Sequence, residues 1–368
     1  MKYYIIAGER SGDLHGAALI RELKQKDTNA EFRLWGGDQM KSEAGEGLVK
    51  HYREMAFMGF LEVIKNIRTI KGFIKECKRD ILAYKPDVVL LIDYPGFNLR
   101  IAKFAHQQHM PVHYYISPKV WAWNQKRALK IKKNIDKLYC IFPFEVDFYK
   151  QYDYQVQYVG NPLVPAVNNH PYDESLINKW SKQNVIAILP GSRKQELFNI
   201  LPVLEELTKV YSSYKFLVAA VDNLEDKTYD RARELSNVEV IYDKTYEIVK
   251  AAKVAIVASG TATLETALIG TPQVVVYKTS GFSYFIAKSL IRVPYISLVN
   301  LVAGKEAVPE LIQSDFTPEN IKKWLDDLLS SNEDKRKFQL SCYTEIKEIL
   351  GDHNTSLLVA SEMTNSLK

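Results

Sequence analysis

The residues best suited to chemistry lie in short loops that follow apolar runs. The first such loop, residues 8–16, has glycines at positions 8, 12 and 16 and opens a helical pattern. Glycine lets the backbone approach a ligand, and a helix N-terminus favours an anion. The loop's polar side chains include Glu9, Ser11, Asp13 and His15. A tight turn would explain the glycines alone. The polar cluster instead indicates a site, with Glu9 and His15 as catalytic candidates and Ser11 and Asp13 as candidate substrate contacts.

Asp93 is the candidate general base. It directly follows the apolar run 88–92, and Asn98 comes shortly after it. A carboxylate at the carboxyl end of a buried strand lies where α/β sheets bind ligands, so Asp93 could take a proton from an attacking hydroxyl. An Asx-type turn before the next helix is the alternative. We predict that His15 orients Asp93 and that Asn98 belongs to the same site.

Two tryptophans, Trp121 and Trp123, follow the next apolar run, 112–116. Large aromatic rings on a loop pack on something apolar, because leaving them in water is costly. The sequence leaves open whether that partner is the protein's own core or a substrate.

A loop in the second half of the chain is suited to a phosphate. Gly191, Ser192 and Arg193 follow the apolar run 185–189 and open a helix that contains Glu196. The planar guanidinium of arginine can hold a phosphate through two parallel hydrogen bonds. We therefore predict an anion site at this strand end.

A second loop repeats this logic after the run 254–258. Its predicted ligand residues are Ser259, Gly260, Thr261, Thr263 and Glu265. The hydroxyls and the helix N-terminus suit a pyrophosphate, and Glu265, one turn into the helix, could bind ribose hydroxyls. Ser and Thr also begin ordinary helices, so either loop alone is weak. Two such loops without a Gly-x-x-x-x-Gly-Lys-Ser/Thr motif favour a sugar nucleotide.

Two further polar residues, Asn300 and Glu306, interrupt an otherwise apolar passage, residues 297–310. We assign both to the donor site, with helix capping as the alternative.

The elements that position these loops are short β-branched and aromatic runs alternating with helical patterns. The predicted strands are 3–7, 32–35, 88–92, 112–116, 138–142, 157–159, 185–189, 215–220, 238–242, 254–258 and 273–277. Near-continuous apolar strands separated by helices indicate parallel sheets covered on both faces. We predict an α/β protein with two doubly wound, Rossmann-like domains that face a cleft, followed by C-terminal helices.

The pattern also predicts domain bounds. We expect a first, acceptor and membrane-facing domain at 1–165, a linker at 166–183, and a nucleotide-binding domain at 184–345. A C-terminal helix at 346–368 could pack on the first domain or exchange with a partner chain, so a homodimer stays open.

Composition narrows the class of protein. The chain has 368 residues and a formal net charge of +5, which is too small to indicate nucleic-acid binding. Its three cysteines have no metal-type spacing and suit a reducing compartment. No signal segment and no stretch of about 20 apolar residues is present, which predicts a soluble or peripheral cytoplasmic protein.

Residues 58–75 have the pattern of a helix lying on a membrane surface. At about 100° per residue, one apolar face contains Phe60, Ile64, Ile67, Ile70 and Ile74. Arg68, Lys71 and Lys75 flank that face. Apolar groups would enter the acyl boundary and cations would meet anionic headgroups. An ordinary amphipathic helix on the sheet is the alternative.

Taken in chain order, these loops resemble the motif set of the lipid-A-disaccharide synthase family, from the first strand to about residue 313. The matching stretches are Ala7-Gly8-Glu9 with Ser11-Gly12-Asp13, Ile92-Asp93 with Phe97-Asn98, Val120-Trp121-Ala122-Trp123, Leu189-Pro190-Gly191-Ser192-Arg193, Ser259-Gly260-Thr261-Ala262-Thr263-Leu264-Glu265, and Asn300 with Ala303-Gly304 and Val308-Pro309-Glu310-Leu311. Single loops resemble many nucleotide-sugar transferases, but the ordered set is specific.

The resemblance implies a GT-B fold, with the acceptor on the first domain and UDP on the second. It therefore implies that the acceptor side contains Ser11, Asp13, Asn98, Trp121 and Trp123. It implies transfer of 2,3-diacylglucosamine from its UDP derivative to 2,3-diacylglucosamine 1-phosphate (lipid X), which forms a β-1,6 disaccharide 1-phosphate with inversion. No metal or cofactor is implied, and the enzyme would act at the anionic cytoplasmic face of the inner membrane.

The chain departs from the family pattern at Gly96, where many relatives carry an acid, at Arg10, which replaces a small residue, and at Asn124, where a basic residue is common. The alternatives are a transferase for UDP-N-acetylglucosamine, an epimerase of the same fold, and a two-lobed sugar-binding protein. A dehydrogenase is disfavoured because the first loop lacks the dinucleotide spacing.

Overall fold

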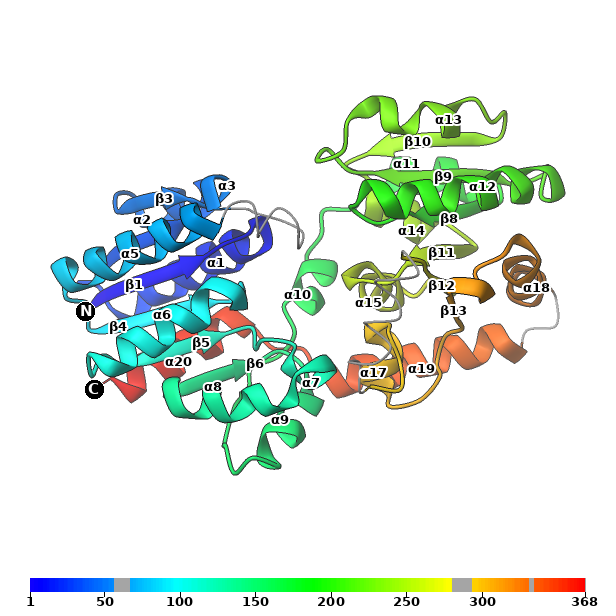
Figure 1. Ribbon diagram of the computed structural model, residues 1–368. Coiled ribbons are helices and arrows are strands. Elements are labelled where there is room, and N and C mark those ends of the chain that lie inside the picture. The colour runs from blue at the N-terminus through cyan, green and yellow to red at the C-terminus, as the bar shows by residue number, and fades with distance from the viewer. Residues whose placement is uncertain (56–66, 280–292, 331–333, 368) are drawn as a thin grey trace. The chain divides into compact units, whose positions relative to one another are not determined.

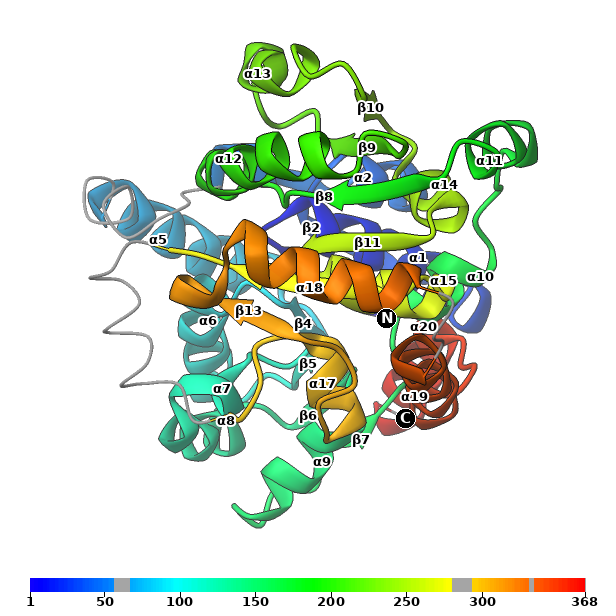
Figure 2. The ribbon, with the colours of Figure 1, turned by 90° about the vertical axis from the view of Figure 1, so that its right-hand side faces the viewer.

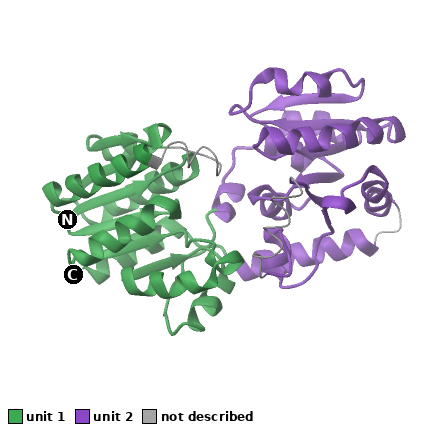
Figure 3. Cartoon of the chain, viewed as in Figure 1, with its two compact units in different colours: residues 1–162, 352–368 green, residues 163–351 purple. Residues whose placement is uncertain are grey.

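The chain forms two compact units in a computed structural model that describes residues 1–55, 67–279, 293–330 and 334–367. The first unit is Met1–Pro162 with Asp352–Lys368, and the second is Leu163–Gly351 (Figure 3). Each unit is built around its own parallel sheet. The two-sheet α/β architecture predicted from the sequence is therefore confirmed.

The first unit has a seven-stranded sheet in the order β3-β2-β1-β4-β5-β6-β7. Its strands are β1 (Lys2–Ala7), β2 (Glu31–Gly36), β3 (Leu48–His51), β4 (Val88–Ile92), β5 (Val112–Tyr115), β6 (Lys137–Cys140) and β7 (Gln157–Tyr158). Its helices are α1 (Arg10–Lys26), α2 (Asp38–Ala44), α3 (Tyr52–Met55), α5 (Ile67–Tyr84), α6 (Pro95–Gln107), α7 (Val120–Trp123), α8 (Ala128–Asn134), α9 (Pro143–Lys150) and α20 (Thr355–Ser366).

The second unit has a six-stranded sheet in the order β10-β9-β8-β11-β12-β13. Its strands are β8 (Val185–Leu189), β9 (Lys215–Ala220), β10 (Val238–Tyr242), β11 (Val254–Ala258), β12 (Gln273–Tyr277) and β13 (Glu310–Ile312). Its helices are α10 (Leu163–Asn168), α11 (Glu174–Ser181), α12 (Lys194–Val210), α13 (Asp230–Arg233), α14 (Thr245–Ala251), α15 (Thr261–Ile269), α17 (Leu298–Ala303), α18 (Pro318–Leu329) and α19 (Asp334–Leu350).

Each predicted strand is present, and two strands were missed. The missed strands, β3 and β13, lie at sheet edges and are short. Leu48–His51 is half-buried along its whole length and Glu310–Ile312 has only three residues, so neither contains the long apolar run that marks a central strand.

The segment expected to link two domains belongs to the second unit. Within it, α11 packs on α14 and buries Ile177 and Trp180. The apolar face of α11 therefore makes this segment part of a core. At the other end, α19 stays in the second unit to Leu350, and only α20 joins the first. Helix α20 packs on α1, so the red C-terminal helix of Figure 1 lies with the first unit.

In each sheet the strand order reverses once, between β1 and β4 in the first unit and between β8 and β11 in the second. On one side of this point the strands are added in one direction across the sheet, and on the other side in the opposite direction. Such a reversal opens a crevice beyond the carboxyl ends of the two central strands. Figure 2 shows β8 and β11 as neighbours, as their hydrogen-bonded register requires. The loops selected from the sequence follow β1, β4, β8 and β11. No described helix is long and apolar enough to cross a bilayer.

Candidate active site

The crevice of the first unit begins where the loop after β1 touches the loop after β4. A Cβ on Gly8 would lie 2.2 Å from Cδ1 of Tyr94, so only glycine lets the two loops come this close. Asp93 and Tyr94 both have positive φ, 44° and 49°. Left-handed backbone is uncommon outside glycine, and consecutive residues of this kind cluster at functional sites.

Asp93 lies in this strained turn, and hydrogen bonds hold its backbone carbonyl in place. The hydroxyl of Tyr114 and Nδ2 of Asn98 both donate to the Asp93 carbonyl, the latter at 2.8 Å. Burial raises the pKa of the Asp93 carboxyl, while the nearby Lys119 ammonium lowers it. A carboxylate with a raised pKa is a better proton acceptor, which suits a general base.

Asn98 holds the loop together from inside. It is fully buried, and its Nδ2 also donates to the carbonyl of Ile92 at 3.2 Å. These contacts assign Asn98 to positioning the Asp93 turn, and no described contact of its amide faces outward.

His15 lies in the first turns of α1, where its ring packs edge-on against Tyr115 with centroids 6.3 Å apart. Burial lowers the pKa of His15 to about 4, so its ring is neutral at physiological pH. Within the described residues no hydrogen bond joins His15 to Asp93. Burial raises the pKa of the Tyr94 phenol and the negative charge of Glu9 raises it further, which places Glu9 near the Asp93 turn.

Asp13 has a different task from its neighbours. Its side chain is 2% exposed, and its oxygens accept backbone N–H groups of Gly37 at 2.7 Å, Met40 at 3.1 Å and Gln39 at 3.1 Å. Those groups open α2, so Asp13 caps that helix from α1. Ser11, in contrast, is exposed on the first turn of α1.

The two tryptophans after β5 separate into a buried and an exposed one. Trp121 is 5% exposed, and its Nε1 donates to Oε1 of Glu145 at 3.0 Å. The other oxygen of Glu145 accepts the backbone N–H groups of Ile141 and Phe142. Burial raises the pKa of Glu145 to about 7.

Trp123 is 44% exposed, and the Arg127 guanidinium lies 5.1 Å from its ring centroid. Of the two indoles, Trp123 is the one available to a substrate or lipid.

In the second unit, the loop after β8 is a tight anion-type turn. Gly191 has φ 91°, and a Cβ there would lie 2.2 Å from Oε2 of Glu196. That oxygen accepts the backbone N–H of Arg193 at 3.1 Å, so Glu196 holds the turn rather than pointing away from it. The Arg193 side chain is 73% exposed and only 3.6 Å from the Glu196 carboxylate. Because the side chain is exposed, this ion pair is weak, and the guanidinium can turn toward an anion.

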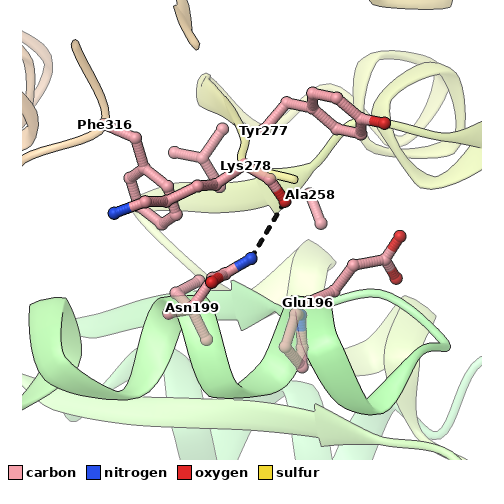
Figure 4. Close-up of a pocket in the computed structure, with 9 residues that line it drawn as sticks. Glu196, Asn199, Ala258, Tyr277, Lys278 and Phe316 are labelled. Carbon is pink, nitrogen blue, oxygen red and sulfur yellow. Dashed lines mark hydrogen bonds between the residues drawn. The ribbon is translucent and has the colours of Figure 1, made fainter. Parts of the chain in front are cut away.

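A small pocket lies where this turn meets the ends of β11 and β12. Its lining includes Glu196, Asn199, Ala258, Tyr277 and Lys278. Figure 4 shows Glu196 and Asn199 rising from α12, and Asn199 Nδ2 donates to the Lys278 carbonyl at 2.9 Å. The strand ends and α12 therefore form one recess at the carboxyl edge of the sheet.

The loop after β11 presents a helix N-terminus at the same edge. Gly260 precedes α15, no side chain among the described residues caps that helix, and Gly260 and Thr261 are exposed. Uncapped N–H groups at a helix start are ready anion ligands. Ser259 Oγ donates to the Ile296 carbonyl and Thr263 Oγ1 to the Gly260 carbonyl, so both hydroxyls are engaged within the protein.

Glu265 is half-buried one turn into α15, where it accepts a hydrogen bond from the hydroxyl of Tyr246 at 2.7 Å. Burial raises the pKa of Glu265, and the Tyr246 hydrogen bond lowers it. Tyr246 stands just past the carboxyl end of β10.

Among the described residues, Asn300 is connected to the loop after β11 only through other residues, since it donates to Glu310, which accepts the backbone N–H of Ile296, whose carbonyl accepts Ser259 Oγ. Asn300 is fully buried; its Nδ2 donates to Val308 and Glu310, and its Oδ1 accepts from Ala307 and Val308. Its amide is fully used in holding that loop. Glu306 is exposed beside Gln339, which bonds the first residue of β12, Gln273. Glu306 thus lies toward the amino edge of the sheet, opposite the loops that follow β8 and β11, because residues before a parallel strand lie at its amino end.

The predicted membrane face is only partly described. Phe60 and Ile64, and the side chain of Ile67, lie outside the described residues. On α5, Arg68, Lys71 and Lys75 are exposed, while Ile70 and Ile74 are half-buried.

Sequence reasoning missed Tyr246, Glu145 and Lys119. All three follow the carboxyl end of a strand or open the next helix, as the selected residues do. The rule that found Asp93 and Gly191 would have found Tyr246 had it been applied to the strand 238–242. Glu145 carried no signal, because an acid in the first turn of a helix is ordinary.

Comparison with known proteins identifies the family. A family model described as lipid-A-disaccharide synthetase matches residues 3–358. The chain belongs to the lipid-A-disaccharide synthase family. The lipid-A-disaccharide synthase of Syntrophus aciditrophicus is 39% identical over 357 residues, covering 94% of this chain and 93% of that protein. That of Nitrosococcus oceani is 38% identical over 360 residues, with 94% and 92% covered. As a family member, the chain is a glycosyltransferase of lipid A biosynthesis.

Solved structures show the fold. The UDP-GlcNAc 2-epimerase of Neisseria meningitidis bound to UDP-GlcNAc is 16% identical, with TM-score 0.69 over 99% of this chain and 100% of that one. The glycotransferase of kitacinnamycin is 15% identical, with TM-score 0.64 over 100% and 99%. Both support the two-domain GT-B fold of this family member.

Proposed function

We propose that the chain transfers 2,3-diacylglucosamine from UDP-2,3-diacylglucosamine to lipid X, with inversion at the anomeric carbon and release of UDP. The observation that carries this proposal is the complementary chemistry of the two sheet crevices. One holds a carboxylate of raised pKa in a strained turn, and the other holds an arginine and an uncapped helix N-terminus. Sugar transfer from a nucleotide needs a base for the acceptor and an anion site for the leaving group.

In this mechanism the carboxylate of Asp93 removes the proton of the 6-hydroxyl of lipid X. The oxygen then bonds to the anomeric carbon of the donor from the side opposite UDP, while the bond from that carbon to the UDP oxygen breaks. The displaced charge develops on the β-phosphate. Arg193 and the N–H groups at the start of α15 stabilise this charge, which is the larger electrostatic task. Glu265 binds the ribose hydroxyls.

His15, neutral because of its burial, shapes the wall of the acceptor crevice, and Glu9 lies beside the Asp93 turn. Trp123, with its exposed ring, is the tryptophan that contacts acceptor or lipid.

Because both substrates carry acyl chains, the enzyme works at an anionic membrane surface on the cytoplasmic side. Two described stretches of the first unit support this. The exposed cations of α5 include Lys71 and Lys75. The stretch 119–134 has six basic residues and no acid, and it exposes Trp123 at 44% and Leu129 at 55%. Exposed apolar groups among cations fit a lipid interface.

The test is product analysis with the purified full chain. Incubation with UDP-2,3-diacylglucosamine and lipid X should give UDP and a disaccharide 1-phosphate by mass, with a β coupling constant by NMR. Two control reactions separate the alternatives. UDP-N-acetylglucosamine with lipid X should give no product, and UDP-2,3-diacylglucosamine alone should not epimerise. Product in either control, and none in the main reaction, would overturn the proposal.

A further inference from the structure

The second unit contains an aromatic cluster whose role the transfer mechanism leaves unexplained. It connects the segment between α10 and α11 to helices α14 and α15. The ring of His170 packs edge-on against Tyr246 with centroids 4.8 Å apart, and against Tyr172 at 4.7 Å. The phenol of Tyr246 then reaches Glu265.

The cluster is anchored by a buried acid on α14. Glu247 is 1% exposed, and its Oε1 lies 3.2 Å from Nε2 of His170. The same oxygen accepts the backbone N–H of Asp173 at 3.3 Å and lies 3.7 Å from the Lys244 ammonium. These contacts hold His170 in place, and His170 in turn restricts the ring of Tyr246.

Glu265 has one strong partner among the described residues. Its carboxylate receives the Tyr246 hydroxyl at 2.7 Å, and the only other effect on its pKa is burial. The pKa of Tyr246 is itself raised, by burial first and by the charge of Glu265 second, so the phenol keeps its proton and donates. A carboxylate has two oxygens and several acceptor positions, so one donor leaves capacity for a ligand.

We propose that Tyr246 is a positioning residue of the nucleotide site. Its hydroxyl fixes one oxygen of Glu265, so that the other is presented to the two ribose hydroxyls of UDP. This inference rests on the proposed function, in which Glu265 binds the ribose. A half-buried carboxylate without this donor would rotate freely and would ionise less readily, and both changes weaken a hydrogen bond to the ribose.

The test compares UDP with 2′,3′-dideoxy-UDP by calorimetric titration of the full chain. The ratio of the two dissociation constants reports the ribose contact and cancels any general loss of folded protein. The unaltered chain should prefer UDP by about tenfold or more, as expected for hydrogen bonds to a charged group. Tyr246→Phe should reduce this preference several-fold, to near the value of Glu265→Gln.

Two controls complete the design. Tyr172→Phe removes a hydroxyl from the same cluster, one that donates only to the Val167 carbonyl at 3.4 Å, and should keep the full preference. In the double variant Tyr246→Phe/Glu265→Gln the preference should equal that of Glu265→Gln alone, because Tyr246 acts through Glu265. In transfer assays Tyr246→Phe should raise the KM for the donor and leave kcat nearly unchanged, because a ribose contact is made equally in ground and transition states.

The outcomes separate this inference from the proposed function. If Glu265→Gln abolishes the preference and Tyr246→Phe retains it, the positioning role is wrong and the ribose assignment stands. If the unaltered chain shows no preference for UDP, or Glu265→Gln keeps that preference, Glu265 does not bind ribose. Both the ribose assignment of Glu265 and the positioning role of Tyr246 are then wrong. The product analysis would still decide the transfer reaction by itself.

Discussion

The crevices of the two units share one architecture but differ in burial, backbone strain and charge. Both open beyond the central strands of a parallel sheet at the point where strand order reverses. In the first unit Asp93 and His15 are half-buried, the turn after β4 is strained, and burial shifts the pKa values of both groups. In the second, the cation is exposed, the strain falls on a glycine, and a helix start is left uncapped.

The contrast teaches that proton transfer and anion binding make opposite demands on burial. A general base works better when its pKa is raised toward the working pH, which is the direction in which burial shifts the pKa of a carboxyl group. An anion site needs donors that reach a large, hydrated ligand, and here exposure and backbone N–H groups serve better. Under the proposed mechanism, the two halves of the reaction therefore take place in different surroundings.

The largest expected effect comes from Asp93→Asn. Asparagine tolerates left-handed backbone, so the turn should survive while the base is lost. We expect kcat to fall by about 10²–10⁴-fold, with UDP affinity by calorimetry unchanged. The raised pKa of Asp93 should also make the unaltered enzyme lose activity as pH falls through values above the ordinary aspartate pKa. Turnover close to that of the unaltered enzyme would remove Asp93 as the base.

Glu145→Gln tests whether burial in the first unit raises the pKa of the Glu145 carboxyl. Since the folded-state pKa of Glu145 is raised from 4.5 to about 7, its contribution to stability is fully present below pH 4.5 and is lost as pH rises through 7. The loss is at most about 3 kcal/mol, from about 1.4 kcal/mol for each pKa unit.

Hydrogen exchange of the β5 and β6 amides between pH 5 and 8, corrected for intrinsic rates, measures this change. The glutamine variant should be less stable overall, because its amide group faces N–H donors, but its stability should lack that pH slope. An identical slope in both proteins would contradict the assignment.

Arg193→Ala should weaken UDP binding by about tenfold, the low end of the range for charge-assisted hydrogen bonds, because this side chain is exposed. Titration with UDP measures the effect. Lys194→Ala is a matched control, since that ammonium lies 5.6 Å from the ring of Phe198 and belongs to the same helix start. Equal losses in both variants would mean that only net charge matters.

The last prediction concerns lipid binding, with an expected effect no larger than that of Arg193→Ala. Lys71→Ser/Lys75→Ser should lower binding to vesicles containing anionic lipid by about tenfold at low salt, since each cation contributes about 1 kcal/mol and screening reduces the sum. Lys179→Ser/Lys182→Ser removes two exposed cations from the second unit and should change nothing. If both pairs behave alike, the first unit is not the membrane-facing one.

Much of this organisation could be predicted because parallel sheets leave a strong local signal. Fully apolar runs such as Val88–Ile92 and Val185–Leu189 mark central strands, and the residues just after them must lie at the carboxyl edge. That is why Asp93 and Gly191 could be selected without a structure. Edge strands such as Glu310–Ile312 carry no such signal, because only part of their surface is buried.

The chain's sequence alone determined the two parallel sheets, the family motifs and the order of loops at the strand ends, because these depend on short-range spacing. Only the tertiary structure decided which polar side chains remain available to a substrate. Asp13 is used by the start of α2 and Asn300 by its own loop, whereas Glu265 meets a tyrosine from another helix. Hydrogen-bond partners come from segments brought together by folding, and no local pattern records them.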